Sequence, residues 1–220
     1  MLTLAIDAAT YGGSVAVIER DRVLAAREVA MRGEREERLM PSVAEALDDA
    51  GVGVADLARV VCGAGPGSFT SLRIAASIAK GIAAARAIPL VAVSSLLLIV
   101  AGASCSERGG RYLAVLDAMR GDVYVAGFEV ADVHLIRELS PMAVVPRAEL
   151  PAMSERLAAR LIGPAEELTA GPHARGVARL DRLLEVARPV DLASWEPHYG
   201  RLAEAQVRWE HAHGRPLPGA

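Results

Sequence analysis

The chain has 220 residues, of which 52% are hydrophobic and 23% are charged, a composition typical of a globular protein and not of a disordered one. Its 24 basic and 27 acidic side chains give a net charge of −3, which excludes the bulk positive charge of an autonomous nucleic-acid-binding protein. Cys62 and Cys105 belong to no Cys-x-x-Cys or Cys/His motif with metal-ligand spacing, so we expect two free thiols in a reducing, cytoplasmic compartment.

Three short strands are predicted at the N-terminus, over Leu2 to Ile6, Ser14 to Glu19 and Val23 to Val29. Turn-forming residues separate them, first around Gly12 and then in the charged run that follows Glu19. Short consecutive strands joined by tight turns indicate an antiparallel meander. The first run has no basic segment and meets a carboxylate at Asp7, so we interpret it as a strand and not as a secretory signal.

The next elements alternate between helix and strand, which is the pattern of an α/β fold. Gly51 is expected to end the first helix, and Ser68 or Thr70 is expected to cap the second. The predicted elements are an amphipathic helix from about Arg35 to Ala50, a strand from Leu57 to Cys62, a glycine-rich turn from Gly63 to Gly67 and a helix from Ser68 to Arg86.

The segment from Ala87 to Ser106 contains no charged residue and is long enough to cross a bilayer. Pro89 near its start, the β-branched Val91 and Val93, and a Ser94-Ser95 pair before an apolar run argue against a continuous span. We therefore expect a short buried strand followed by a buried helix that begins at this serine pair, and no membrane span.

A second block of elements is predicted after the polar segment from Ser104 to Arg111. Strands are expected over Tyr112 to Leu116 and Val123 to Val130, and helices over Met153 to Leu161, Ala178 to Ala187 and about Arg201 to His213. The sequence shows no tandem repeat with a period of about 20–50 residues. Two lobes are the simplest organisation, residues 1–103 and 104–220, with the last helix a candidate to pack back on the first lobe.

The stretch from Gly63 to Ile74 is the most informative. Three glycines around Pro66 lie between a predicted strand and a predicted helix, where backbone N–H groups can meet either an anion or a closely packed chain segment. The stretch matches neither the Gly-x-x-x-x-Gly-Lys-Ser/Thr phosphate loop nor the Gly-x-Gly-x-x-Gly dinucleotide pattern. From the residues alone, an anion site and a structural turn both stay open.

Several short motifs occur in order along the chain: Asp7-Ala8-Ala9-Thr10, Gly65 to Arg73, Val93-Ser94-Ser95-Leu96 and Asp117 to Tyr124, with a Pro-x-Tyr-x-Arg motif from Pro197 to Arg201. In sequence and in order they resemble the motifs of the TsaB (YeaZ) family, whose members are the dimerisation subunit of the bacterial machinery that makes threonylcarbamoyladenosine in tRNA. The Gly-Pro-Gly-Ser-Phe-Thr signature is followed by Ser71 where the family usually has Gly, and Ala75 and Ala8-Ala9 also depart from the family pattern.

The resemblance implies an actin-like, RNase-H-like α/β fold of two lobes, each with a mixed sheet and flanking helices. It also implies a non-catalytic chain that binds and activates the catalytic relative TsaD, with TsaE as the ATPase subunit, a homodimer when alone, and tRNA reached only through the complex. No cofactor is then expected on this chain alone, although ATP or ADP is expected as a candidate at the joint surface with TsaD. The metal-binding histidine pair of TsaD corresponds to Ser95 and Ile99, which are not strong metal ligands, so no metal and no catalytic residue are expected.

Two sets of candidate residues follow. The first set is either nucleotide-contacting or structural, and comprises Asp7, Thr10, Gly65, Pro66, Gly67, Ser68, Phe69, Thr70 and Arg73. The second set is the partner interface that the resemblance implies on the two N-terminal helices, and comprises Leu39, Val43, Leu47, Ile74, Ser77, Ile78, Gly81 and Ile82. The five histidines are expected at the surface: His134, His173, His198, His211 and His213.

A free-standing actin-like ATPase or kinase is the alternative function, using Asp7, Thr10 and the loop from Gly65 to Thr70. An acidic residue at the end of the first strand positions metal and phosphates in nucleotide-hydrolysing proteins of that fold, but neither loop contains a lysine. A glycoprotease is disfavoured, because the chain has no His-Glu-x-x-His or Gly-x-Ser-x-Gly motif and no identifiable base for Ser68.

Overall fold

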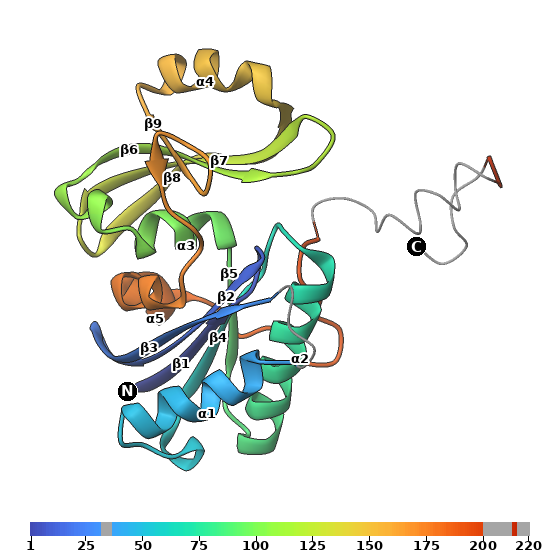
Figure 1. Ribbon diagram of the computed structural model, residues 1–220. Helices are drawn as coiled ribbons and strands as arrows, with labels where there is room; N and C mark the ends of the chain where they lie inside the picture. The colour runs from blue at the N-terminus through green and yellow to red at the C-terminus, as the bar shows by residue number, and fades with distance from the viewer. Residues whose placement is uncertain (32–36, 200–212, 215–220) are drawn as a thin grey trace.

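Two five-stranded sheets form the framework of the computed structural model, which describes residues 1–31, 37–199 and 213–214 (Figure 1). Sheet A has the order β3-β2-β1-β4-β5 and sheet B the order β10-β9-β6-β7-β8. Sheet A consists of β1 (Leu2–Asp7), β2 (Gly12–Glu19), β3 (Arg22–Ala30), β4 (Arg59–Gly63) and β5 (Leu90–Val93). Sheet B consists of β6 (Gly110–Asp117), β7 (Asp122–Asp132), β8 (Leu135–Pro146), β9 (Arg160–Gly163) and β10 (Leu168–Thr169).

The two sheets have the same topology. In each, the first three strands in sequence pair antiparallel, and two further strands are added in parallel beside the first strand. The N-terminal meander is therefore confirmed, and a second meander with the same strand order follows it. The predicted class of two mixed sheets with flanking helices is also confirmed.

The helices form layers around and between the sheets. Helix α4 covers the outer face of sheet B, α1 and α2 cover the outer face of sheet A, and α3 and α5 lie between the sheets (Figure 1). The helices are α1 (Leu39–Asp49), α2 (Phe69–Arg86), α3 (Ser95–Gly102), α4 (Leu150–Leu157) and α5 (Asp181–Val186), with short 3-10 helices η1 (Val54–Asp56), η2 (Ser104–Arg108), η3 (Arg147–Glu149) and η4 (Ala174–Leu180).

The central strands of each sheet are buried on both faces, and their side chains alternate between two cores as the pleat requires. On β6, Leu113 and Val115 pack beneath α4, whereas Tyr112, Ala114 and Leu116 belong to the central core between the sheets. The central core also contains residues of sheet A, of α3 and of η4. One apolar core is therefore shared by the two sheets.

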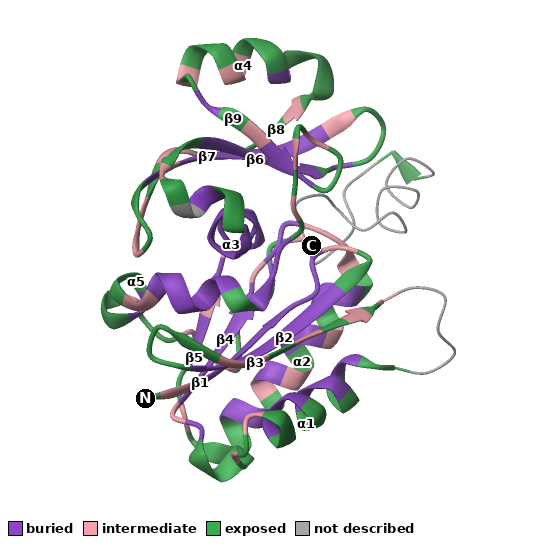
Figure 2. Ribbon diagram, turned by 60° about the vertical axis from the view of Figure 1, so that its left-hand side comes forward, coloured by how far each residue is buried: buried purple, intermediate pink, exposed green. Residues whose placement is uncertain are grey.

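The uncharged segment after Ala87 forms β5 and α3, as predicted. All eight residues of α3 are buried, and Figure 2 shows this helix as a fully buried element enclosed by the rest of the protein. Among the described residues, no helix combines the length and the hydropathy that crossing a bilayer requires. The apolar composition of this segment is accounted for by its central position.

Several predicted boundaries were wrong. The first amphipathic helix begins at Leu39, although residues 32–36 lie outside the described residues. The helix expected up to Leu161 ends at Leu157, because Ala158 adopts a left-handed φ of 48° and the chain then enters β9. Strand β8 was not predicted at all. The helix predicted from about Arg201 lies outside the described residues except at its final position, His213.

The chain returns to sheet A after sheet B is complete. Helix η4 packs on sheet A and α3, and residues 190–199, here called the C-terminal strap, run along β5 and α2. The N–H of Val190 donates to the carbonyl of Leu90 at 2.9 Å, and that of His198 donates to the carbonyl of Ala64 at 2.7 Å. The ammonium of Lys80 lies 5.7 Å from the centre of the Trp195 ring. The division at residue 103 stays a prediction, but the C-terminal part of the chain completes the N-terminal lobe.

Candidate functional site

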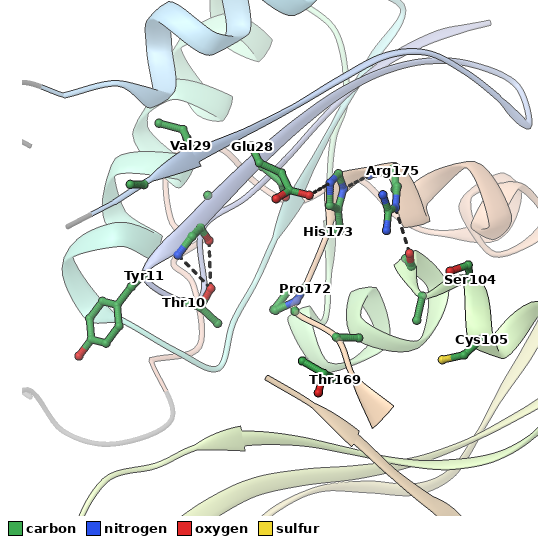
Figure 3. Close-up of a pocket in the computed structure, with 18 residues that line it drawn as sticks. Thr10, Tyr11, Glu28, Val29, Ser104, Cys105, Thr169, Pro172, His173 and Arg175 are labelled. Atoms are coloured by element: carbon green, nitrogen blue, oxygen red, sulfur yellow. Dashed lines mark hydrogen bonds and ion pairs between the residues drawn. The ribbon is translucent and has the colours of Figure 1, made fainter. Parts of the chain in front are cut away.

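A cleft of about 620 Å³ opens between sheet A and the elements that lead to and from sheet B. Figure 3 shows its walls, with Thr10 and Tyr11 on one side and Ser104, Cys105 and Thr169 on another. The lining comes from four segments: residues 10–14 between β1 and β2, residues 28–30 at the end of β3, residues 102–105 after α3, and residues 169–175 before and within η4. The cleft is rich in hydroxyl groups and glycine backbone, and no lysine lines it.

The turn between β1 and β2 is stabilised by the side chain of Thr10. The hydroxyl of Thr10 donates to the carbonyl of Gly12 at 3.0 Å and accepts from the N–H of Gly12 at 3.2 Å, so its hydrogen-bonding capacity is largely used within the turn. The hydroxyl of Ser14 accepts from the N–H of Ala174 at 2.9 Å, which ties the turn to η4. Tyr11 is half exposed at the mouth of the cleft.

His173 lines the cleft but is buried. The prediction that it lies at the surface was therefore wrong. Its Nδ1 accepts from the N–H of Arg175 at 3.0 Å, so the neutral ring carries its proton on Nε2, which lies 2.9 Å from a carboxylate oxygen of Glu28. Burial and then the charge of Arg175 lower the pKa of His173, and Glu28 opposes the shift. The ring therefore acts as a neutral link between β3 and η4.

Asp7 is completely buried at the end of β1. One carboxylate oxygen accepts from the N–H of Ala9 at 3.0 Å, and the other accepts from the hydroxyl of Ser95 at 2.5 Å. The same hydroxyl accepts from the N–H of Gly65 at 3.1 Å. Burial raises the pKa of Asp7, and the two hydrogen bonds to its carboxylate oppose that shift. The carboxylate thus joins β1 to the start of α3 and to the glycine-rich loop.

The glycines of the loop between β4 and α2 are required by close packing. A Cβ atom on Gly67 would lie 2.0 Å from the carbonyl oxygen of Ala9, and one on Gly65, whose φ is +85°, would lie 2.4 Å from that of His198. The N–H groups of Ala64 and Ser68 donate to the carbonyls of Val93 and Ala9. Since these amides are already bonded, the structural interpretation of this loop fits better than an anion site.

Neither predicted serine cap forms in the expected way. Ser68 is the N-cap residue of α2, but its hydroxyl lies 3.0 Å from the hydroxyl of Ser71 and makes no bond to a helix amide. Ser94 precedes α3, also without a side-chain cap. The unusual residue Ser71, where the family has Gly, thus gives Ser68 a local partner.

A second concavity, of about 470 Å³, lies on the outer surface of α2 and is here called the α2 groove. It is lined by Glu37, Phe69, Thr70, Arg73, Ile74, Ser77 and Ile78. At its rim, the guanidinium carbon of Arg73 lies 4.2 Å from the Phe69 ring centre and 5.6 Å from that of Tyr199 on the C-terminal strap. The Nε–H of Arg73 donates to the Tyr199 hydroxyl at 3.2 Å.

The structure divides the first set of candidate residues among three places. Thr10 lines the cleft and Asp7 is enclosed in the core, whereas Phe69, Thr70 and Arg73 line the α2 groove. Gly65 and Pro66 are buried, and Gly67 and Ser68 are half-buried beside them. These residues therefore do not converge on one site.

The second set of candidate residues, the predicted partner interface on α1 and α2, is only partly accessible. Leu39, Val43, Leu47 and Ile82 are buried in the core between α1, α2 and sheet A, so their side chains are not available to a partner. Ile74 and Ile78 are half-buried, and Ser77 and Gly81 are exposed. Only the second group lies on an accessible face, which narrows the predicted interface to α2.

Some site residues were not predicted. Glu28, His173 and Arg175 line the cleft, and Glu37 and Tyr199 border the α2 groove. The Pro-x-Tyr motif marked the position of Tyr199, but the sequence contains no sign that the strap crosses α2. His173 has an extended backbone and stands directly before η4, which is the ordinary position of a capping residue. The spacing of the histidines in the sequence did not reveal this capping position.

The residues at the position of the TsaD histidine pair do not fit a metal. Ser95 and Ile99 are both fully buried in α3, and the Ser95 hydroxyl is bonded to Asp7. Within residues 1–31, 37–199 and 213–214, no group of three or more His, Cys, Asp or Glu side chains has the geometry to hold a metal ion.

Comparisons with known proteins support the family assignment. The model of a family described as "TsaD: tRNA N6-adenosine threonylcarbamoyltransferase" matches residues 28–160. Two relatives share the description "tRNA threonylcarbamoyladenosine biosynthesis protein TsaB". The Escherichia coli K12 protein is 38% identical over 59% of this chain and 55% of its own length, so that match spans about half of the relative. The Bacillus subtilis 168 protein is 27% identical over 95% of this chain and 98% of its own length.

Comparison with solved structures agrees with the sequence comparisons. The solved structure of YeaZ from Pseudomonas aeruginosa superposes with a TM-score of 0.75 and 26% identity, covering 90% of this chain and 99% of that chain. The fold is thus shared over nearly the whole length of both chains. The matched family model covers residues 28–160, more than half of the chain, so the chain belongs to that TsaD-type family, and the TsaB relatives and the YeaZ structure indicate the TsaB/YeaZ group within it.

Proposed function

We propose that this chain is a non-catalytic subunit of the bacterial machinery for tRNA threonylcarbamoyladenosine synthesis, and that it binds and activates a TsaD-type catalytic subunit. The descriptions of the E. coli and B. subtilis relatives support the pathway. The similarity to the B. subtilis protein extends over nearly the full length of both chains, which supports the same role for the whole chain.

The observation that carries the proposal is the enclosure of Asp7. An acidic residue at this position would have to reach a metal ion or a phosphate to support hydrolysis. Instead, both carboxylate oxygens accept hydrogen bonds from this chain, and the side chain is buried. With the amides of Ala64, Gly65 and Ser68 also engaged, the geometry favours the subunit function over the free-standing ATPase or kinase.

In the proposed complex the exposed face of α2 contacts the TsaD-type subunit. Binding free energy at that surface would favour the active arrangement of the catalytic chain, so this chain would affect turnover without touching the reacting atoms. TsaE as ATPase subunit, self-association of the free chain, ATP or ADP at the joint surface and indirect access to tRNA belong to the same proposal.

Size-exclusion chromatography with light scattering tests the proposal. The chain is run alone and mixed with the TsaD-type subunit of its own organism, and we expect a one-to-one complex. The same preparations are assayed for hydrolysis of magnesium ATP, with Asp7→Asn as the control. Absence of a complex, together with hydrolysis that the Asp7→Asn variant loses, would overturn the proposal in favour of the ATPase or kinase.

A further inference from the structure

The α2 groove combines an apolar floor with a prepositioned cation. Phe69, Ile74 and Ile78 contribute apolar surface, and Thr70 and Ser77 contribute hydroxyl groups. Ile74 and Ile78 also pack against the core beneath α2. The floor is therefore fixed by the fold and is present before any partner arrives.

The guanidinium of Arg73 is held in place by two aromatic rings. The centres of the Phe69 and Tyr199 rings lie 4.6 Å apart at an angle of 51°. The guanidinium carbon of Arg73 lies over both rings, 4.2 Å from the centre of Phe69 and 5.6 Å from that of Tyr199. Its Nε–H is bonded to the Tyr199 hydroxyl, and the two Nη groups are the remaining donors. Holding a long side chain in one conformation before binding reduces the entropy lost on binding.

The two charged residues of the α2 groove, Arg73 and Glu37, differ in whether their charges are already paired. Among the described residues, no carboxylate lies within 4.0 Å of the Arg73 guanidinium, whereas eight other ion pairs are formed within that distance. The Glu37 carboxylate, which also lines the groove, already accepts from the N–H groups of Leu39 and Met40 at the start of α1. The charge of Glu37 is thus engaged by α1, and that of Arg73 faces outward.

We propose that the α2 groove receives an apolar side chain flanked by a carboxylate from the partner subunit, and that Arg73 binds this carboxylate through its Nη groups. A planar guanidinium matches the two oxygens of a carboxylate, and an aromatic clamp keeps it in the required orientation. Tyr199 is a positioning residue, which acts through Arg73. This inference rests on the proposed function and specifies the chemistry of the contact.

The experiment measures the dissociation constant of the complex with the TsaD-type subunit at about 50 mM and about 500 mM NaCl. We expect Arg73→Gln to weaken binding at least about 30-fold at low salt, in the range of an interface hot spot, and to flatten the salt dependence. Arg73→Lys keeps the positive charge but loses the planar guanidinium, so its dissociation constant should lie between those of wild type and Arg73→Gln. Tyr199→Phe keeps the ring, removes the hydroxyl and should weaken binding several-fold.

Arg86→Gln is the matched control, because Arg86 is exposed in the last turn of the same helix and its loss changes the net charge equally. If Arg73→Gln binds no more weakly than Arg86→Gln and keeps the wild-type salt slope, the inference is overturned while the proposed function stays intact. Absence of any complex with the wild-type chain would overturn both. Thermal unfolding of each variant, expected to match wild type, confirms that Arg73→Gln retains the fold.

Discussion

The carboxyl group of Asp7 is anchored by hydrogen bonds from its own chain. It accepts from the N–H of Ala9 and from the hydroxyl of Ser95, within a site that excludes solvent. A buried carboxylate of this kind is stabilised by its donors and destabilised by the loss of water. In this chain burial is the larger effect, since the pKa of Asp7 is raised.

The raised pKa of Asp7 predicts a pH-dependent stability. The folded protein binds a proton on Asp7 more readily than the unfolded chain, so this contribution to stability is fully present below the unfolded pKa and is lost as pH rises through the folded pKa. Asp7→Asn cannot titrate. Urea unfolding at several pH values should show that wild type loses stability relative to Asp7→Asn as the pH rises through that window. Parallel pH profiles for the two proteins would contradict the prediction.

Two glycines of the same region give opposite predictions for substitution by alanine. Gly67→Ala would place a methyl group 2.0 Å from the carbonyl oxygen of Ala9, so the backbone must shift, at a cost of about 2 kcal/mol or more. Gly81→Ala meets no atom within 4 Å in the interior of α2, so the helix should gain about 0.5–1 kcal/mol. Chemical unfolding measures both, and equal effects would show that the loop can relax around the added methyl group.

At the scale of the element, α2 has one buried face and one exposed face. Small residues such as Ala75, Ala79 and Ala83 are fully buried against sheet A, which lets the helix lie close to the strands. Ile74 and Ile78 lie at the boundary, and Ser77 and Gly81 lie on the exposed face. We therefore expect a substitution on the buried face to affect the fold, and one on the exposed face to affect the proposed association.

Charged substitutions at positions 78 and 79 should separate an effect on association from an effect on folding. Ile78→Glu should keep the fold and abolish association with the TsaD-type subunit, because a charge enters the apolar part of the α2 groove. Ala79→Arg should unfold the chain, since Ala79 has no exposed surface. Circular dichroism and light scattering test the pair. Association of Ile78→Glu at the wild-type level would place the interface on another surface.

Sequence patterns predicted the elements that have a strong periodicity or a strong motif. The meander, α2 and the buried α3 were found because alternation, glycines and the Ser94-Ser95 pair marked them locally. Strand β8 was missed because half of its residues are exposed and its course is set by pairing with β7, a long-range contact that no local pattern encodes.

The same distinction applies to the candidate site. Asp7 and the glycine-rich loop were identified from motifs, but the role of Asp7 depends on Ser95, 88 positions away, and that of the loop depends on its bond to Ala9, in the turn after β1. The cluster of Arg73, Phe69 and Tyr199 joins residues 126 positions apart. Such contacts arise from the return of the C-terminal strap to α2, and a single sequence does not reveal them.

For the whole molecule, the central core predicts that the two lobes unfold together. Residues of both sheets, α3 and η4 share this core, and buried Arg179 links its parts. Arg179 donates to the carbonyl of Val133 at 2.8 Å, to the hydroxyl of Ser106 at 2.7 Å and to the carbonyl of Ala101 at 3.1 Å. A core shared in this way favours one cooperative transition.

Differential scanning calorimetry measures this cooperativity. Wild type should show a single transition, and Arg179→Met should lower the free energy of unfolding by about 3 kcal/mol, because several buried carbonyls lose their donor. Exposed Arg182→Met is the control and should change stability by less than about 0.5 kcal/mol. Two separate transitions in the wild-type protein would show that the lobes are independent.

The repeated topology is visible only at this scale. Asp7 ends β1 and accepts from the N–H two residues later, and Asp117 ends β6 and does the same with Met119. The two aspartates differ in environment, since Asp7 is buried and Asp117 is exposed. Each lobe thus has the same aspartate-to-amide hydrogen bond at the end of its first strand, although the sequence shows no tandem repeat.

The contact of Lys80 with Trp195 has a practical consequence for handling the protein. Lys80 is the only lysine in the 220-residue sequence, so it is the one side chain here that amine-reactive dyes and surfaces can modify. Attachment at Lys80 would put the label beside the C-terminal strap, on the helix that carries the α2 groove. Any measurement of association is therefore better made with this amine unmodified.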